Sequence, residues 1–170
     1  MKRRNFLQNS AFFGAAAVFC TANFGLSNLN AKQNTNLNSQ NGAKMENYLF
    51  EIARKRRSIR TYGKKPIEKN ILDEIMKIAL CAPSSFGYRP VEFVLVQDKS
   101  MIRKIGQCKT LGGSQLDGAD TVVVVMVKTQ NERAAEFWIE DGAVASAYIL
   151  LAAEQYEIGA CWVQIRNRTG

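Results

Sequence analysis

Histidine is absent from the 170-residue sequence, and its absence excludes several kinds of catalytic and metal site. A Ser-His-Asp triad, a Cys-His pair and a histidine-ligated zinc or haem each need an imidazole, so this chain cannot form them. Cysteine is scarce as well: the four residues are Cys20, Cys81, Cys108 and Cys161, and none of them stands at CxxC spacing. We therefore assign no metal ligand, and we expect free, mostly buried thiols.

Acidic residues are missing from the first 22 positions, which begin with Lys-Arg-Arg at residues 2–4. The apolar stretch at 11–19 that follows is too short to cross a bilayer, so we expect no stable membrane anchor. This pattern predicts a cleavable signal peptide over residues 1–22, and Arg3-Arg4-x-Phe6-Leu7 is typical of the twin-arginine export signal. We therefore predict a periplasmic protein. A generic secretory leader and a cytoplasmic location are the alternatives.

Residues 23–44 are polar and rich in asparagine, and we expect a flexible linker because they lack the apolar mass to fold. The folded part should be a single domain, residues 45–170. Without the first 22 residues, which hold three basic residues and no acid, the net charge falls from +8 to +5. That excess favours anionic ligands. The basic cluster at 54–60 lacks interleaved aromatic residues for base stacking, so we expect no nucleic-acid partner.

Hydrophobic periodicity divides the folded part into helices and strands. Apolar residues at helical spacing predict helices over 45–57, 66–82, 100–107 (with Ser100 as its cap) and 132–157. Apolar runs predict buried strands over 91–97, 121–127 and 160–165, of which the valine-rich 121–127 is the strongest. The last helix is apolar almost all round, so it should be central to the core or to a dimer interface. The order predicts an α+β or α/β layer built around a sheet.

Two short segments carry groups that suit an anionic, planar ligand. Arg56-Arg57-Ser58-Ile59-Arg60 gathers guanidinium groups around a hydroxyl where the first helix should end. Each guanidinium can grip phosphate oxygens with two N–H groups and keeps its charge. Ala82–Pro90 is a Pro/Ser/Gly loop after the second helix, and its small residues let backbone donors approach a ring. A solvated helix end is the alternative interpretation of the basic cluster.

Four segments, in this order along the chain, resemble the nitroreductase family of FMN-dependent oxidoreductases. They are Arg56–Arg60, Ala82–Pro90, Trp138-Ile139-Glu140-Asp141-Gly142-Ala143 and Gly159-Ala160-Cys161-Trp162-Val163-Gln164-Ile165-Arg166. The resemblance implies an α+β domain with a central mixed sheet flanked by helices. It also implies FMN as cofactor, NAD(P)H as electron donor and a nitroaromatic or quinone-like acceptor. The cofactor carries the chemistry in such enzymes, so we assign no catalytic side chain.

The resemblance further implies which residues contact FMN. The first motif would hold the phosphate and ribityl chain, the loop would lie near the ring, and the end of the last strand would face the reactive nitrogen. The implied cofactor-binding residues are Arg56, Arg57, Ser58, Arg60, Pro83, Ser84, Ser85, Gly87, Arg89, Val163, Gln164 and Ile165. The family is typically homodimeric, with flavin at the subunit interface, so we also expect a homodimer.

The sequence departs from the family pattern in three ways. Arg89-Pro90-Val91 stands where the family usually has Gln-Pro-Trp. The middle loop offers Ser114 or Gln115 in place of a clear ring-binding amide. The chain also stops at Gly170, about where the family continues, so we expect the FMN-binding domain to be incomplete. The alternative function is therefore a truncated, catalytically inactive flavin-binding or interaction module.

Overall fold

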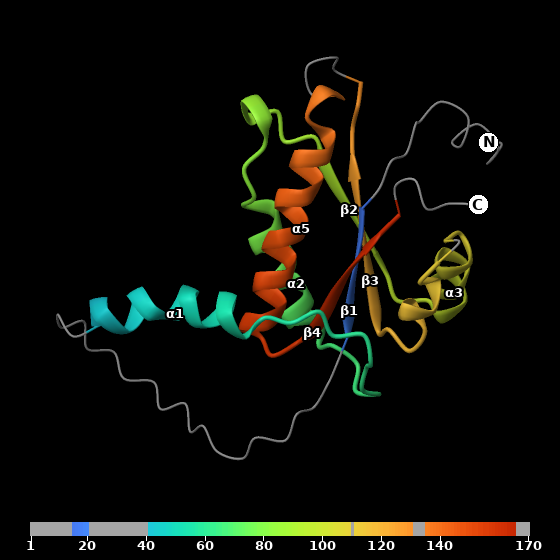
Figure 1. Ribbon diagram of the computed structural model, residues 1–170, viewed down its shortest axis with the longest axis horizontal. Coiled ribbons are helices and arrows are strands. Elements are labelled where there is room, and N and C mark those ends of the chain that lie inside the picture. The colour runs from blue at the N-terminus through green and yellow to red at the C-terminus, as the bar shows by residue number, and fades with distance from the viewer. Residues whose placement is uncertain (1–14, 21–40, 110, 131–134, 166–170) are drawn as a thin grey trace.

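The computed structural model describes residues 15–20, 41–109, 111–130 and 135–165 (Figure 1). In chain order the elements are β1 (Ala15–Cys20), α1 (Asn41–Lys55), α2 (Lys69–Leu80), η1 (Ser85–Gly87), β2 (Val91–Val96), α3 (Lys99–Gln107), η2 (Gly113–Leu116), β3 (Thr121–Val127), α5 (Trp138–Gln155) and β4 (Gly159–Gln164). Each helix and strand predicted from periodicity is present, and β3 has the predicted bounds. The segment at 15–20 was not predicted to be a strand.

The four strands form one sheet in the order β2-β3-β1-β4. All pairings between these strands are antiparallel. The α+β class is confirmed, but the strands are antiparallel where a mixed sheet was expected. Among the described residues, the parallel pairing is a single bridge between Ser58 and Ala160.

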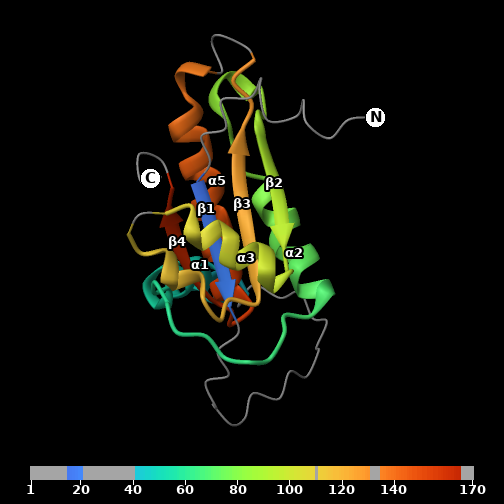
Figure 2. The same cartoon turned by 90° about the vertical axis from the view of Figure 1, so that its right-hand side faces the viewer.

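Helices cover both faces of the sheet, as Figures 1 and 2 show: α2 and α5 lie on one face and α3 on the other. Successive side chains of β3 point to opposite faces of the sheet, so its valine run supplies apolar side chains to both faces. Val123 packs with Ile75 of α2 and Ile149 of α5. Its neighbour Val122 packs with Ile102 of α3 in a second cluster. The valine run is therefore buried on both sides, as predicted.

Helix α5 is a core helix, one of the two alternatives that its sequence left open. Small residues on its buried side allow close approach to the sheet and to α2. A Cβ atom at Gly142 would lie 3.3 Å from Cγ2 of Val127 on β3. The hydroxyl of the buried Ser146 has a hydrogen-bond partner, because it donates to the Gly142 carbonyl at 2.7 Å. Within the described ranges, none of the helices is both long and apolar enough to span a membrane.

Three details differ from the sequence predictions. Strand β2 was expected to be buried, but it lies at the sheet edge, and Val94 and Leu95 are 43% and 42% exposed. Asp98, not Ser100, caps α3, because the Asp98 carboxylate accepts the Met101 N–H at 2.7 Å. The described thiols are free, but Cys161 alone among Cys81, Cys108 and Cys161 is buried.

The N-terminal region contributes more backbone to the fold than its sequence indicates. Residues 15–20, inside the predicted signal peptide, form β1 between β3 and β4. Helix α1 begins at Asn41, so residues 41–44 of the predicted linker are helical. The rest of the predicted signal peptide and linker lies outside the described residues.

Candidate functional site

The arginine-rich segment follows α1 and lies against the beginning of β4. Ser58 bridges Ala160 in a parallel pairing, and the Ile59 N–H donates to the Ala160 carbonyl at 3.0 Å. Gly159 allows this approach, because a Cβ atom there would lie only 3.0 Å from Cγ2 of Ile59. The segment is therefore fixed to the strand that carries Val163 and Gln164. This contact joins two of the three predicted parts of the site.

The arginines of this segment have different partners. Arg57 donates to the carbonyls of Arg54 at 2.6 Å and Arg56 at 2.9 Å, so it caps the C-terminal end of α1. Arg60 makes one long hydrogen bond, at 3.3 Å, to the Ser58 carbonyl. Within the described part of the chain, neither Arg56 nor Arg60 pairs with a carboxylate. These two guanidiniums and the exposed Ser58 form a cationic surface that suits a phosphate.

The Pro-Ser-Ser loop is held in a tight conformation by its own backbone. Phe86, Gly87 and Arg89 have φ values of 52°, 70° and 48°, in the left-handed region that non-glycine residues rarely adopt. The hydroxyl of Ser84 accepts the Arg89 N–H at 2.7 Å, and the Ser84 carbonyl accepts the Gly87 N–H at 3.0 Å. Pro83, Gly87 and Arg89 are exposed. The loop therefore offers a preformed surface.

A buried carboxylate anchors this loop to the N-terminal part of α5. One oxygen of Asp141, Oδ1, accepts both the backbone N–H of Ser85 at 2.7 Å and its hydroxyl at 3.0 Å. Asp141 is only 3% exposed, and its second oxygen has no hydrogen-bond partner within the described residues. A buried carboxylate is costly unless it is well bonded. The two hydrogen bonds from Ser85 stabilise this carboxylate, and they fix the position of Ser85.

The end of β4 carries the third predicted part. Val163 is buried, Gln164 is exposed and Ile165 is half-buried. Val163 belongs to the cluster that contains Ile102, and Tyr62 packs against that cluster. The chain that leaves Arg60 therefore continues alongside β4.

The predicted site residues form two separate groups in one chain. Ser85 contacts Asp141 in the first turn of α5, whereas Ser58 contacts Ala160 just beyond the last turn (Figure 1). At 1.5 Å per residue, the 18 residues of α5 measure about 27 Å. One flavin mononucleotide does not extend that far. The arginine segment and the end of β4 are together, and the Pro-Ser-Ser loop is apart from both.

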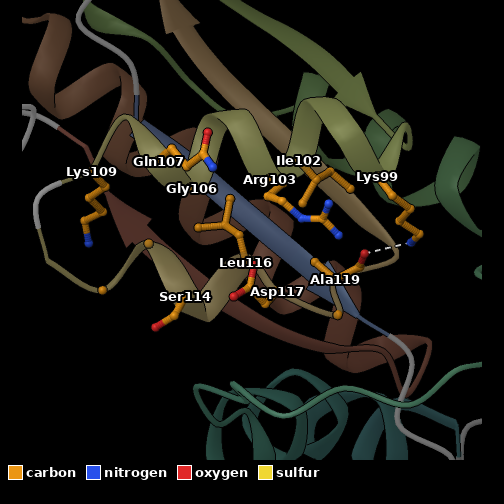
Figure 3. Close-up of a pocket in the computed structure, with 13 residues that line it drawn as sticks. Lys99, Ile102, Arg103, Gly106, Gln107, Lys109, Ser114, Leu116, Asp117 and Ala119 are labelled. Carbon is orange, nitrogen blue, oxygen red and sulfur yellow. Dashed lines mark hydrogen bonds between the residues drawn. The ribbon is translucent and has the colours of Figure 1, made fainter.

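A separate cavity of about 740 Å³ lies between α3 and η2, and Figure 3 shows its lining. Lys99, Arg103 and Lys109 make it cationic, but Lys99 already donates to the Ala119 carbonyl at 2.8 Å. Ser114, a weak candidate for ring binding, lines it; none of the implied cofactor-binding residues does. The cavity is therefore not part of the predicted site.

Comparison with known proteins identifies the family of this chain. The family model for "Nitroreductase family" matches residues 53–109, which include both the arginine segment and the Pro-Ser-Ser loop. A solved structure of an FMN-dependent nitroreductase from Clostridium difficile R20291 is 42% identical, with a TM-score of 0.66, over 70% of this chain and 68% of that one. The chain belongs to the nitroreductase family.

Two archaeal relatives in this family are each named NADH dehydrogenase/NAD(P)H nitroreductase. The protein from Methanothermobacter thermautotrophicus is 32% identical over 69% of this chain, and the one from Archaeoglobus fulgidus is 31% identical over 66%. The chain spans 61% and 65% of the length of these two nitroreductase relatives.

Sequence reasoning missed two residues that build this candidate site. Asp141 lies in a motif that carried the family resemblance, yet no role was assigned to it. Its signal was an acid directly before the small apolar residues of a predicted core helix, where a buried carboxylate needs a specific partner. Gly159 begins the last of the segments that carried the resemblance, and no role was assigned to it. Its close contact with Ile59 is a long-range feature that a single sequence does not reveal.

Proposed function

We propose that this chain is an FMN-dependent oxidoreductase that transfers electrons from NAD(P)H to a nitroaromatic or quinone-like acceptor. The observation that carries the proposal is the contact between the arginine segment and β4. It holds Ser58 and Ile59, which lie between Arg56 and Arg60 in the sequence, against the strand whose end would face the flavin ring. The proposed phosphate donors and the proposed ring-facing backbone would then lie on one surface of the fold.

The chemistry of the residues present fits FMN. Arg56 and Arg60 offer guanidinium groups without a carboxylate partner in the described residues, and Ser58 offers an exposed hydroxyl. Ser84, Ser85 and Gly87 would position the ring from a loop whose shape is already fixed. When bound, FMN would supply the two-electron chemistry. The protein would bind the phosphate, orient the ring and limit access of water.

We also propose that the working form is a homodimer. The two groups of site residues lie at opposite ends of α5, so a second copy can bring its Pro-Ser-Ser loop to the arginine segment. Helix α1 extends away from the body of the molecule (Figure 1), and Leu49 and Phe50 on it are 64% and 62% exposed. Phe86 of the loop is 69% exposed. Exposed apolar groups of this size are typical of a protein interface.

Titration of the purified full chain with FMN tests the cofactor. We expect a yellow protein with visible absorption, and a mass in solution twice that of one chain. Oxidation of NADH and NADPH with a quinone or nitroaromatic acceptor then tests the reaction. A colourless protein that gains no colour with FMN would contradict the proposal. Bound FMN without turnover would support the inactive flavin-binding alternative.

Export to the periplasm by the twin-arginine route is a proposal that rests on the N-terminal sequence alone. The position of β1 favours the cytoplasmic alternative, because cleavage after residue 22 would remove a strand of the sheet. The intact mass of protein isolated from each compartment distinguishes the two. Loss of 22 residues from the periplasmic form would support export.

A further inference from the structure

Three aromatic side chains, which we call the aromatic cluster, meet where the Pro-Ser-Ser loop contacts the beginning of α5. They are Phe86, Tyr88 and Phe137. The ring centroid of Phe86 lies 5.8 Å from that of Tyr88 and 5.7 Å from that of Phe137, at interplanar angles of 48° and 65°. These are ordinary distances for interacting aromatic rings. Asp141 brings the rings together, because it binds Ser85 and lies one helical turn after Phe137.

Packing of the core does not explain the aromatic cluster. Phe86 is 69% exposed and Tyr88 is 43% exposed, and neither they nor Phe137 belong to the two hydrophobic clusters of the fold. Phe86 also has a φ of 52°, which is unfavourable for a bulky side chain. Backbone strain of this kind is concentrated at ligand-binding sites and active sites. The loop therefore holds an aromatic ring at a fixed position without burying it among the described residues.

A cation belongs to the same loop. The Ser84 hydroxyl accepts the Arg89 N–H at 2.7 Å, which closes the loop around the residues between them. Arg89 is exposed, and its guanidinium forms no ion pair within the described part of the chain. A guanidinium can bind a carboxylate through two parallel hydrogen bonds. The family usually has an uncharged Gln at this position, so the charge is a feature of this chain.

We propose that Phe86, Tyr88 and Phe137 form a stacking site for the aromatic ring of the electron acceptor, and that Arg89 binds a carboxylate on that ring. The substrate class is then a planar aromatic acid, such as a nitroarene or quinone that carries a carboxylate. The role of this ligand as electron acceptor rests on the proposed function, whereas the binding of an aromatic acid by the loop does not. In the proposed homodimer, the loop would lie beside the flavin, where an acceptor must bind to receive electrons.

Two probes that differ in charge test the role of Arg89. The probes are para-nitrobenzoate and para-nitrobenzamide, which have similar size and shape, and only the first is an anion. In calorimetric titrations of the full chain without NAD(P)H, we expect the benzoate to bind roughly tenfold more tightly than the benzamide. Arg89→Gln should reduce this preference to within about twofold, since it removes the charge-assisted contact. Lys64→Gln, an exposed cation outside the loop, is the matched control and should retain the preference.

Phe86→Ala tests the stacking site with the same two probes. We expect this variant to bind both probes about threefold to tenfold more weakly and to retain the preference for the benzoate, because the ring contact does not depend on charge. Met101→Ala is the control, since Met101 is an exposed apolar residue on α3, away from the loop. The mass of each variant in solution is measured as well, because an exposed Phe86 could instead contact a second copy.

Each result has a defined meaning. Loss of the preference in Arg89→Gln, together with weaker binding of both probes by Phe86→Ala, supports the inference. Equal binding of the two probes by the unsubstituted protein, or a preference that Arg89→Gln retains, would overturn it. Weaker binding by Phe86→Ala that accompanies loss of the dimer would assign the ring to the interface and overturn its stacking role.

The same titrations separate this inference from the proposed function. They are carried out with and without added FMN, and the FMN affinity of the chain is measured independently. The expected probe pattern in a chain that binds no FMN would support the aromatic-acid site and contradict the proposed flavoenzyme. Oxidation of NADH or NADPH by both nitroarenes at equal efficiency, without the probe preference, would support the flavoenzyme and overturn the selection of an anionic acceptor.

Discussion

Arg57 and Arg60 show how neighbouring residues of one type come to have different tasks. The sequence places both in a single cationic cluster, and the resemblance assigns both to FMN. In the structure, Arg57 binds the carbonyls at the end of α1, whereas Arg60 makes one long hydrogen bond. The solvated helix end that was the alternative interpretation therefore describes Arg57 better than it describes Arg60.

We predict that Arg60→Ala weakens FMN binding roughly ten- to hundredfold, because a hydrogen bond to a charged group contributes about 1.5–3 kcal/mol. Arg57→Ala should leave FMN affinity unchanged within about twofold and slightly lower the stability of α1. Fluorescence titration of FMN measures both variants, with Lys64→Ala as an exposed cationic control outside the segment. Equal FMN affinities for Arg60→Ala and Lys64→Ala would show that the segment is only a helix end.

Asp141 is the residue whose role required coordinates to recognise. Its carboxylate holds Ser85 by two hydrogen bonds in a buried environment. We predict that Asp141→Ala lowers the free energy of unfolding by about 2–3 kcal/mol, since it leaves the Ser85 N–H without its partner. Asp141→Asn retains an acceptor oxygen and should cost less. Urea unfolding measures the difference, and exposed Glu140→Ala is the control. Equal stability of Asp141→Ala and Glu140→Ala would contradict the anchoring role.

At the scale of elements, the sequence was most informative where local pattern and burial agree. Seven consecutive β-branched and apolar residues predicted β3 to the residue, because a strand covered on both faces must be apolar throughout. The end of α2 at Leu80 follows from Pro83. The position of β2 at the sheet edge was not predicted, because this strand, which contains the exposed Val94 and Leu95, has the composition of a buried strand. Which strands are neighbours is a long-range property that local periodicity does not contain.

The cap of α3 allows a prediction about pH. Hydrogen bonds from the Ser100 hydroxyl and the Met101 N–H lower the pKa of the Asp98 carboxyl. A carboxyl whose pKa is lower in the folded state stabilises that state above its unfolded pKa, about 3.9, and the contribution is lost as pH falls through the folded pKa. At neutral pH the Asp98→Ala variant should therefore melt at a lower temperature than the unsubstituted protein. This difference in melting temperature should vanish in strong acid.

Asp98→Asn separates the cap from the charge. Asparagine is also a good N-cap, so this variant should melt close to the parent at neutral pH and show less change as pH falls. Thermal unfolding by circular dichroism at several pH values measures all three proteins. If the melting temperatures of Asp98→Ala and the unsubstituted protein differ by the same amount at every pH, the carboxylate charge contributes nothing to the cap.

For the whole molecule, the sequence identified the parts of the site but not their separation. Family resemblance implied three groups of FMN-binding residues, and the structure joins two of them through the bridge between Ser58 and Ala160. The third, the Pro-Ser-Ser loop, is fixed to the opposite end of α5 by Asp141. The N-terminal segment was likewise interpreted from its local pattern alone. An apolar run has the same composition in a leader and in an inner strand, so the local pattern did not predict that residues 15–20 pair with β3 and β4.

If two copies build each flavin site, two defective variants should complement each other. Arg56→Ala with Arg60→Ala damages the phosphate half, and Gly87→Val damages the loop half, because a β-branched residue is strained at φ 70°. In a mixed dimer, one site has both defects and the other has none. Random exchange of equal amounts should therefore restore about a quarter of the FMN sites, since half the dimers are mixed and each has one intact site.

Fluorescence titration after denaturation and refolding of the mixture measures the restored sites. Each variant refolded alone is the control for residual binding, and a mixture of either variant with itself must restore nothing. A site contained within one chain would give no complementation, because each chain would keep its own defect. Restoration above the sum of the two controls would require that the arginine segment of one copy and the loop of the other bind the same FMN.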